Sequence, residues 1–158
     1  FPQEFAALQG VLHDFLKQNT FEGKPLSDML GGWTGRMLPL RGLPIVTYYK
    51  NWIYFCDDFD LVQIDTIEPK PGIPPSPKHT RELQDRMRRD GIKVMLSVNY
   101  FDEQTVKSIA EATGATYRMV PYYVGGSAGV GDYFCLVDHW IDALVSMATE
   151  AGVQGGAR

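Results

Sequence analysis

Apolar residues recur along the chain with two different periods. Between residues 2 and 18 they return every three or four positions, as in an amphipathic helix (Phe5, Leu8, Val11, Leu12, Phe15 and Leu16). A stretch rich in glycine and proline follows, with a short helix expected at residues 26–37. Four short apolar runs come next, at residues 45–49, 61–67, 93–99 and 116–121. Each is followed by a helical segment or a long connection, and this alternation predicts an α/β fold with a parallel sheet and helices on both faces.

Capping residues mark the ends of three of these helices. Ser76, followed by a proline, predicts the start of a helix that Gly91 closes. Asp102 predicts the start of a second helix, which ends at Gly114, and Asp132 predicts the start of a long third helix. The three helices follow the second, third and fourth apolar runs, as the alternation of strands and helices requires.

The composition is that of a globular protein with an acidic balance. Of the 158 residues, 44% are hydrophobic and 22% are charged, and fifteen basic against nineteen acidic side chains give a net charge of −4. Nucleic-acid affinity comes largely from Lys and Arg that displace counterions, so we expect no nucleic-acid partner. No apolar run approaches the roughly 18 residues of a membrane span. The chain begins at Phe1, already inside a helical pattern, and we expect it to be a processed or truncated product.

The sequence carries no catalytic motif. Cys56 and Cys135 give neither a disulfide framework nor metal-ligand spacing, and their apolar helical surroundings predict buried free thiols. The three histidines are far apart, and no Ser-His-Asp or Cys-His arrangement stands out. None of these patterns indicates a catalytic site.

Two loops are candidates for ligand binding. The loop from Gly125 to Gly131 precedes a helix and could hold an anion, but it lacks the Lys-Ser/Thr of a P-loop and does not fit G-x-G-x-x-G. A flexible connection is favoured there, and a small Rossmann-like enzyme or nucleotide-binding domain is the alternative function. The other loop, residues 68–77, has five prolines in ten residues, which make it stiff and extended. It follows a parallel strand, so it lies at the carboxyl edge of the sheet, where open α/β folds bind ligands, and His79 comes directly after it.

Four segments resemble the solute-binding proteins of zinc and manganese ABC importers. They are residues 45–55 (IVTYYKNWIYF), 68–77 (EPKPGIPPSP), 98–102 (VNYFD, with Thr105 after it) and 124–134, which begin VGG and end DYF. The resemblance covers about residues 36–150, and residues 1–20 resemble part of the long helix that joins the two lobes of these proteins. It implies a three-layer Rossmann-like lobe with a four-stranded parallel sheet, for which we expect the strand order 2-1-3-4.

The resemblance also implies a division of the chain and a metal site. Residues 1–35 would be an interlobe linker helix and insertion, residues 36–152 the C-terminal metal-cleft lobe, and residues 153–158 a frayed tail. In this family two lobes close on one metal ion and both supply ligands, and the first lobe with its two usual ligands is absent here.

Tyrosines occupy both positions at which the second lobe of the family supplies a ligand. A His or Glu usually stands just after the first strand, where this chain has Tyr49, and a carboxylate stands in the loop after the last strand, near Tyr122 or Tyr123. By the same resemblance, Trp52 and His79 are expected to line the cleft.

A tyrosine at a ligand position changes the metal that is expected. Its pKa of about 10 means that ionisation costs roughly 4 kcal/mol at pH 7, a cost that imidazole does not carry. The resemblance implies zinc or manganese, whereas tyrosinate ligands, with Tyr49 first and Tyr123 second, would favour ferric iron. In the alternative interpretation both tyrosines only line the cleft.

The resemblance further implies a binding protein and not an enzyme, and it implies partners and a location. The expected partners are a metal ion, the N-terminal lobe that is missing from this chain, and an ABC permease in the membrane. The expected location is periplasmic or extracellular, which is compatible with lipid or membrane association.

Overall fold

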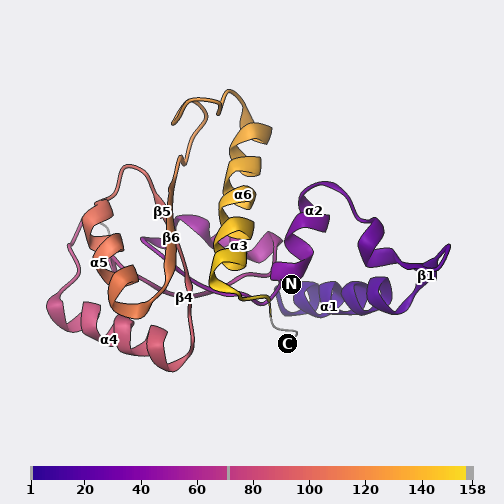
Figure 1. Cartoon of the computed structure of the whole chain (residues 1–158), viewed down its shortest axis with the longest axis horizontal. Coiled ribbons are helices and arrows are strands. Elements are labelled where there is room, and N and C mark those ends of the chain that lie inside the picture. Colours follow the sequence, from indigo (N-terminus) through magenta and orange to yellow (C-terminus); the bar gives the residue numbers. More distant parts are fainter. Residues whose placement is uncertain (1, 71, 156–158) are drawn as a thin grey trace. The chain divides into compact units, whose positions relative to one another are not determined.

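The chain forms two compact units, at residues 1–39 and 40–158 (Figure 1). The computed structural model describes residues 2–70 and 72–155, so the end of the expected frayed tail, at residues 156–158, lies outside the described residues. The functional division at residue 36 that the resemblance implies stays a prediction.

The first unit is built around the predicted N-terminal helix. Helix α1 (Pro2–Gln18) is followed by an antiparallel hairpin of β1 (Thr20–Phe21) and β2 (Lys24–Pro25), then by the 3-10 helix η1 (Leu26–Met29) and helix α2 (Gly32–Met37). The hydrophobic pattern does not predict the hairpin, because each of its strands has only two residues.

The single helix expected at residues 26–37 is two helices. Leu30 ends the 3-10 helix in an extended conformation, and Gly31 is extended as well. Gly32 then has a φ of 62°, in the left-handed region that glycine enters without strain. These backbone angles interrupt a pattern that otherwise has helical spacing.

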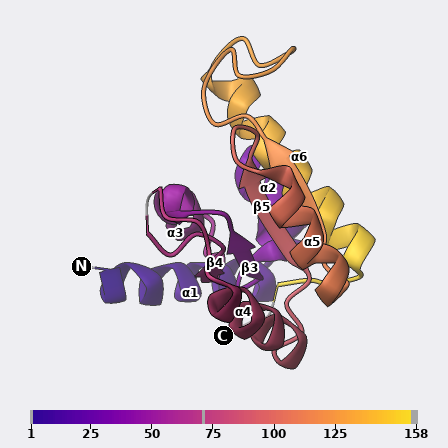
Figure 2. The same cartoon turned by 90° about the vertical axis from the view of Figure 1, so that its left-hand side faces the viewer.

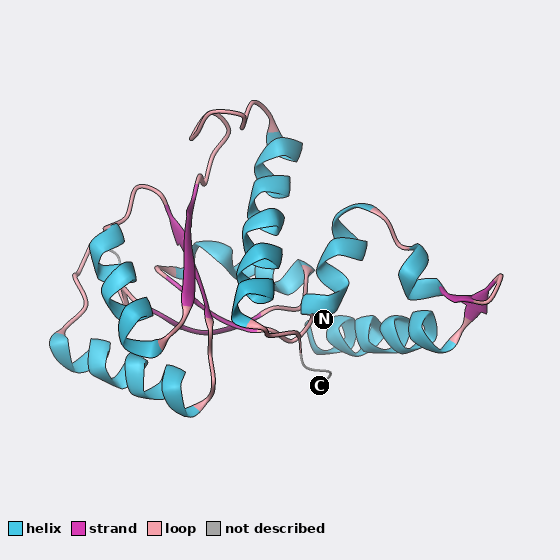
Figure 3. Ribbon diagram, in the orientation of Figure 1, coloured by secondary structure: helices cyan, strands magenta, loops and turns pink. Residues whose placement is uncertain are grey.

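The second unit alternates strands and helices, as the four apolar runs predict (Figure 3). It begins with the end of the 3-10 helix η2 (Leu38–Leu40). Its further elements, in chain order, are β3 (Pro44–Thr47), η3 (Lys50–Trp52), α3 (Ile53–Asp58), β4 (Val62–Thr66), α4 (Pro77–Arg89), β5 (Val94–Val98), α5 (Glu103–Thr113), β6 (Thr116–Val120) and α6 (Tyr133–Ala151).

All four strands of the second unit are parallel and follow the order β4-β3-β5-β6. Counted over these four strands, this is the predicted order 2-1-3-4. Ile45 of β3 lies opposite Val94 of β5, and Val94 lies opposite Thr116 of β6. Every residue of β5 is buried, as expected for a central strand with helices on both sides.

Helices cover both faces of this sheet. On one face, Val46 and Met95 pack with Leu83 of α4 and Ile109 of α5 in a buried cluster, and Figure 2 views the unit from this side. Because side chains alternate along a strand, Ile45, Val94 and Leu96 point to the other face, where α6 lies against β5 and β6. The structure therefore confirms the predicted three-layer α/β fold.

The predicted capping residues begin helices α4, α5 and α6 of the second unit. The Ser76 hydroxyl accepts a hydrogen bond from the backbone N–H of His79, Asp102 accepts from two N–H groups of α5, and Asp132 accepts from that of Cys135. At the other end of α5, Gly114 has the left-handed φ of 64° that its position requires. No described helix is both long and apolar enough to cross a bilayer.

The two cysteines differ in their surroundings. Both are free thiols; Cys56 of α3 is buried, as expected, whereas Cys135 of α6 is exposed, so the prediction of a buried thiol is wrong there. The buried face of α6 runs through residues such as Leu136 and Trp140, and Cys135 lies outside it. Burial, with a smaller contribution from Asp57, raises the pKa of the Cys56 thiol to about 12.

This difference predicts that only one cysteine of the folded chain reacts with a thiol reagent near neutral pH. The thiolate is the reactive form, and both burial and a pKa of about 12 withhold it at Cys56. Labelling should be lost in Cys135→Ser and kept in Cys56→Ser, as measured with dithiobis(nitrobenzoate). Denaturant should release the second thiol in the unchanged chain. Equal labelling of both cysteines in the native protein would contradict the prediction.

Candidate functional site

The loops that follow the four parallel strands leave the sheet at the same edge, its carboxyl edge. Tyr49 follows β3, Glu68 follows β4, Asn99 follows β5, and Tyr123 lies in the loop after β6. In Figure 1 the loop between β6 and α6 is the orange segment at the top of the view. Tyr49 and Tyr123, the two ligands that the sequence predicts, therefore lie in loops at the same edge of the sheet.

Hydrogen bonds join three of these loops to one another. The Tyr122 hydroxyl donates to the backbone carbonyl of Asn51 at 2.9 Å, and the Asn51 side-chain amide donates to the Tyr100 hydroxyl at 3.0 Å. The side-chain amide of Asn99 donates to the carbonyl of Gly126, also at 3.0 Å. The loops after β3, β5 and β6 are thus held in one arrangement.

Tyr49 begins the connection between β3 and α3. It has an extended backbone, is partly buried, and its carbonyl accepts a hydrogen bond from the Thr47 hydroxyl at 2.9 Å. Its own hydroxyl has no hydrogen-bond partner among the described residues. The backbone is therefore fixed, while the phenol oxygen is left available.

The structure separates the two tyrosines of the last loop. The Tyr122 ring packs against Trp52 and Trp140, and burial, followed by the nearby Tyr100, raises the pKa of its hydroxyl. Tyr123 is 58% exposed, and its hydroxyl has no hydrogen-bond partner among the described residues. Tyr122 therefore holds the loops together, and Tyr123 is the one that a ligand can reach.

Two residues expected to line the cleft have other contacts. Trp52 is only 1% exposed and lies in an aromatic cluster with Phe55, Tyr122 and Trp140, so it supports the edge from below and does not line it. His79 is partly buried, and its Nε2 lies 2.9 Å from the carbonyl oxygen of Thr66. Because a carbonyl only accepts, Nε2 carries the proton, and His79 ties the start of α4 to the end of β4.

Glu68 is a buried carboxylate at this edge that the sequence analysis did not single out. It is 8% exposed, its N–H donates to the Tyr48 carbonyl at 2.8 Å, and its carboxylate accepts from the backbone N–H of Gly72. Burial, then Glu68, then Asp102 raise the pKa of the Tyr48 hydroxyl. The signal that was available is an acidic residue directly after an apolar run, at the start of the proline-rich segment.

The glycine-rich loop is closed by its own hydrogen bonds. The N–H of Gly125 donates to the Val130 carbonyl at 2.7 Å, and that of Gly126 donates to the Tyr123 carbonyl at 3.0 Å. The Asp132 carboxylate occupies the N-terminus of α6, and hydrogen bonds from Cys135 there lower its pKa. A phosphate would have to displace these contacts, so the geometry does not favour nucleotide binding.

Within the part of the chain that the structure describes, no three His, Cys, Asp or Glu side chains are grouped so that they could hold a metal ion. That Tyr49 and Tyr123 supply metal ligands stays a prediction.

Comparison with known families identifies the family to which the chain belongs. The family model described as "Zinc-uptake complex component A periplasmic" matches residues 34–147. The chain belongs to this family. The match contains the whole edge of the sheet, including Tyr49 and Tyr123. A comparison with curated protein sequences gives no match.

Solved structures with the same fold are longer than the chain, which matches less than half of each. The laminin-binding adhesin of Streptococcus agalactiae has a TM-score of 0.57 and 22% identity, over 73% of this chain and 44% of its own. FpvC of Pseudomonas aeruginosa, in complex with Mn²⁺, has a TM-score of 0.59 and 24% identity, over 72% of this chain and 43% of its own. A structure of ZnuA gives 0.59 and 21%, over 73% and 40%. The matched part of the chain thus spans less than half the length of these structures, with which it shares the fold.

The close packing around Gly126 predicts that the loop between β6 and α6 does not accept a side chain at this position. An added Cβ there would lie 2.9 Å from the Tyr123 carbonyl oxygen and 3.0 Å from the Cβ of Pro121, whereas a Cβ at Gly131 of the same loop meets nothing within 4 Å. We expect Gly126→Ala to lower the free energy of unfolding by about 1–3 kcal/mol and to shift the NMR resonances of Tyr123. Gly131→Ala should stay within about 0.5 kcal/mol of the unchanged chain. Equal effects of the two variants would show that the close approach at Gly126 is not a constraint.

Proposed function

We propose that this chain is one lobe of a metal-binding, solute-binding component of an ABC-type importer, and that the carboxyl edge of its sheet is one wall of the metal site. Membership of the zinc-uptake family supports this role. Related folds carry metal in their solved forms: FpvC is in complex with Mn²⁺ or with Ni²⁺, and a periplasmic protein of Candidatus Liberibacter asiaticus is bound to Cd. An N-terminal lobe would supply the remaining ligands, and a membrane permease would receive the metal ion.

The observation that carries the proposal is the state of the tyrosine hydroxyls at this edge. Tyr122 donates to Asn51, and Tyr100 accepts from Asn51, so both are engaged within the lobe. Tyr48 is buried, with a raised pKa, and is therefore poorly able to ionise. The resemblance to the family puts Tyr49 at one ligand position and Tyr122 or Tyr123 near the other, and of these the hydroxyls of Tyr49 and Tyr123 have no partner among the described residues.

Two phenolates favour a harder ion than zinc. Ionising a tyrosine at pH 7 costs roughly 4 kcal/mol, which a trivalent ion offsets better than a divalent one because its charge is larger. We therefore propose ferric iron as the metal that Tyr49 and Tyr123 suit, in place of the zinc or manganese of relatives with His and carboxylate ligands. The role is binding and delivery without catalysis, at a periplasmic or extracellular location, where lipid attachment would keep the protein near its permease.

The first prediction from this proposal concerns zinc. Zinc sites take most of their affinity from Cys, His and carboxylate ligands, and the edge offers tyrosines in their place. We expect the chain of residues 1–158 to bind zinc only weakly, with a dissociation constant well above the micromolar range in calorimetry. A submicromolar affinity would show that the site lies elsewhere in the chain.

The second prediction concerns Tyr49 in a protein with both lobes. Loading with ferric iron should give a tyrosinate-to-iron absorption band that is strongly weakened in Tyr49→Phe, because phenylalanine keeps the ring and removes the oxygen. Tyr54→Phe is the matched control, because Tyr54 lies in α3, is 84% exposed and is at no ligand position, and there the band should stay. Unchanged spectra and iron affinity in Tyr49→Phe would show that Tyr49 lines the cleft without binding the metal ion.

A further inference from the structure

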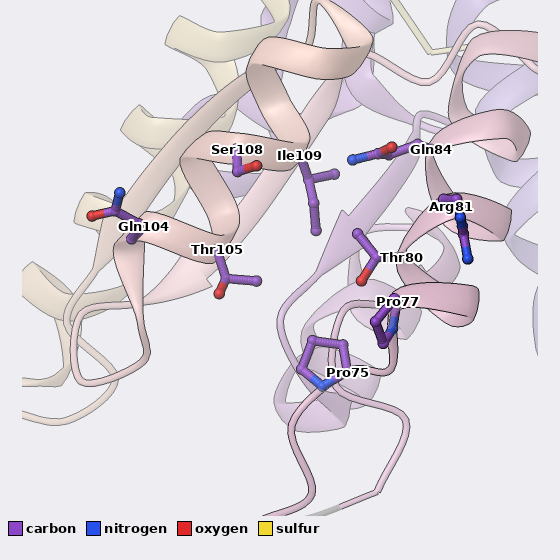
Figure 4. Close-up of a pocket in the computed structure, with 9 residues that line it drawn as sticks. All are labelled: Pro75, Pro77, Thr80, Arg81, Gln84, Gln104, Thr105, Ser108 and Ile109. Atoms are coloured by element: carbon purple, nitrogen blue, oxygen red, sulfur yellow. The ribbon is translucent and has the colours of Figure 1, made fainter.

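A groove of about 530 Å³ lies between the first halves of α4 and α5 (Figure 4). Neither Tyr49 nor Tyr123 lines it, so it is distinct from the proposed metal site. Pro75 and Pro77 form one end, and Ile109, which is only 1% exposed, lies at the bottom between the helices. The volume falls within the usual range for ligand sites in proteins, roughly 300–1,000 Å³.

Both walls of the groove are fixed before any ligand arrives. The start of α4 is held by the bond from the His79 N–H to the Ser76 hydroxyl, at 3.2 Å, and by the bond of the His79 ring to Thr66. The start of α5 is held by Asp102, whose carboxylate accepts from the N–H of Thr105 at 3.1 Å. The prolines at the end of the groove restrict the backbone there further. The surface is therefore preformed, and little conformational entropy would be lost when a ligand binds to it.

The polar groups of the groove suit amides. The hydroxyl of Thr80 donates to the Ser76 carbonyl, and that of Thr105 donates to Asp102, so both oxygens have only acceptor capacity left for a ligand. The side chains of Gln84 and Ser108 have no hydrogen-bond partner among the described residues. Figure 4 shows Thr80, Gln84 and Thr105 directed toward the space between the helices. The groove thus offers both donors and acceptors beside two prolines, and the amides of a polypeptide backbone can pair with both.

One uncompensated charge lies on the rim of the groove. Arg81 is exposed and has no ion-pair partner among the described residues, and no carboxylate side chain lines the groove. A single guanidinium at the rim matches one acidic side chain that stays near water. Phosphate-rich ligands are met by clusters of arginines, and sugars and bases stack on aromatic rings, which the lining residues do not include.

We propose that this groove is a second binding site, which takes an extended segment of a partner protein with one acidic side chain. The segment lies along the two helices, its backbone amides pair with Gln84, Ser108 and the threonine oxygens, and its carboxylate pairs with Arg81. This interaction is independent of the metal, because it uses none of the candidate ligands.

The test is an NMR titration of the 158-residue chain with the peptide acetyl-Ala-Ala-Glu-Ala-Ala-amide. We expect saturable shifts of the backbone amides of Thr80, Gln84 and Ser108. Arg81→Gln should weaken binding about two- to fivefold, as the loss of an exposed ion pair does. Ser108→Leu should abolish the shifts, because Ser108 is exposed on α5 and a larger side chain there fills the groove.

Controls on the peptide and on the same helix make the test decisive. Glu111→Leu adds the same side chain to α5 at an exposed position outside the groove, and should leave binding unchanged. Thermal unfolding of both leucine variants checks that they fold. If Ser108→Leu does not fold, the effect of Arg81→Gln on binding tests the proposal. The absence of saturable shifts would overturn the proposal. Equal binding of acetyl-Ala-Ala-Gln-Ala-Ala-amide, in which glutamine replaces the glutamate, would also overturn it. So would tighter binding of maltose or inorganic phosphate at the same residues.

Discussion

The parallel pairing of four strands is the constraint on which the rest of this lobe depends. Because the strands run in one direction, every loop that follows a strand leaves at the same edge, and residues from positions 49 to 123 of the sequence meet there. The fully buried strand β5 fixes the register, since a shift by one residue would exchange its two faces between the helices that cover them. The arrangement of the edge is therefore set by the burial of side chains that never touch a ligand.

Hydrogen bonds of Asn51 link the loops that meet at this edge. Its backbone carbonyl accepts from Tyr122 and its side-chain amide donates to Tyr100, so one residue joins three loops, while its side-chain oxygen is buried and has no partner among the described residues. Loops between strands and helices are usually the mobile parts of such a fold. Here their mutual bonds leave Tyr49 and Tyr123 as polar groups that are held in place but not engaged within the lobe.

Sequence reasoning succeeded where a single local signal decides the structure. The four strands follow from apolar runs of the right length, and the helix starts follow from Ser76, Asp102 and Asp132, whose side chains each bond to N–H groups a few residues away. The parallel sheet follows from the alternation of strands and helices.

What the sequence could not predict depends on direction in space. Tyr122 and Tyr123 are neighbours of identical chemistry, and only the packing of one against Trp140 separates their roles. Trp52 and Cys135 were misplaced for a related reason, because one faces inward beneath the edge and the other lies just outside the buried face of α6. The burial of Glu68 could not be predicted, because a carboxylate beside prolines is usually exposed and only its hydrogen bond from the Gly72 N–H shows that it is held in the structure.

The proline-rich loop between β4 and α4 has a consequence for proteolysis. Exposed loops are where proteases ordinarily cut, and Lys70 and Ile73 are exposed here, although they pair with each other across a turn and the loop is not extended there as predicted. A protease binds its substrate as an added strand, which requires backbone N–H groups, and a proline has none to offer. Lys70 is followed directly by a proline, the residue after lysine that trypsin-like enzymes reject. The loop can thus stay open to a ligand at the edge of the sheet while being a poor substrate for the proteases that share its surroundings.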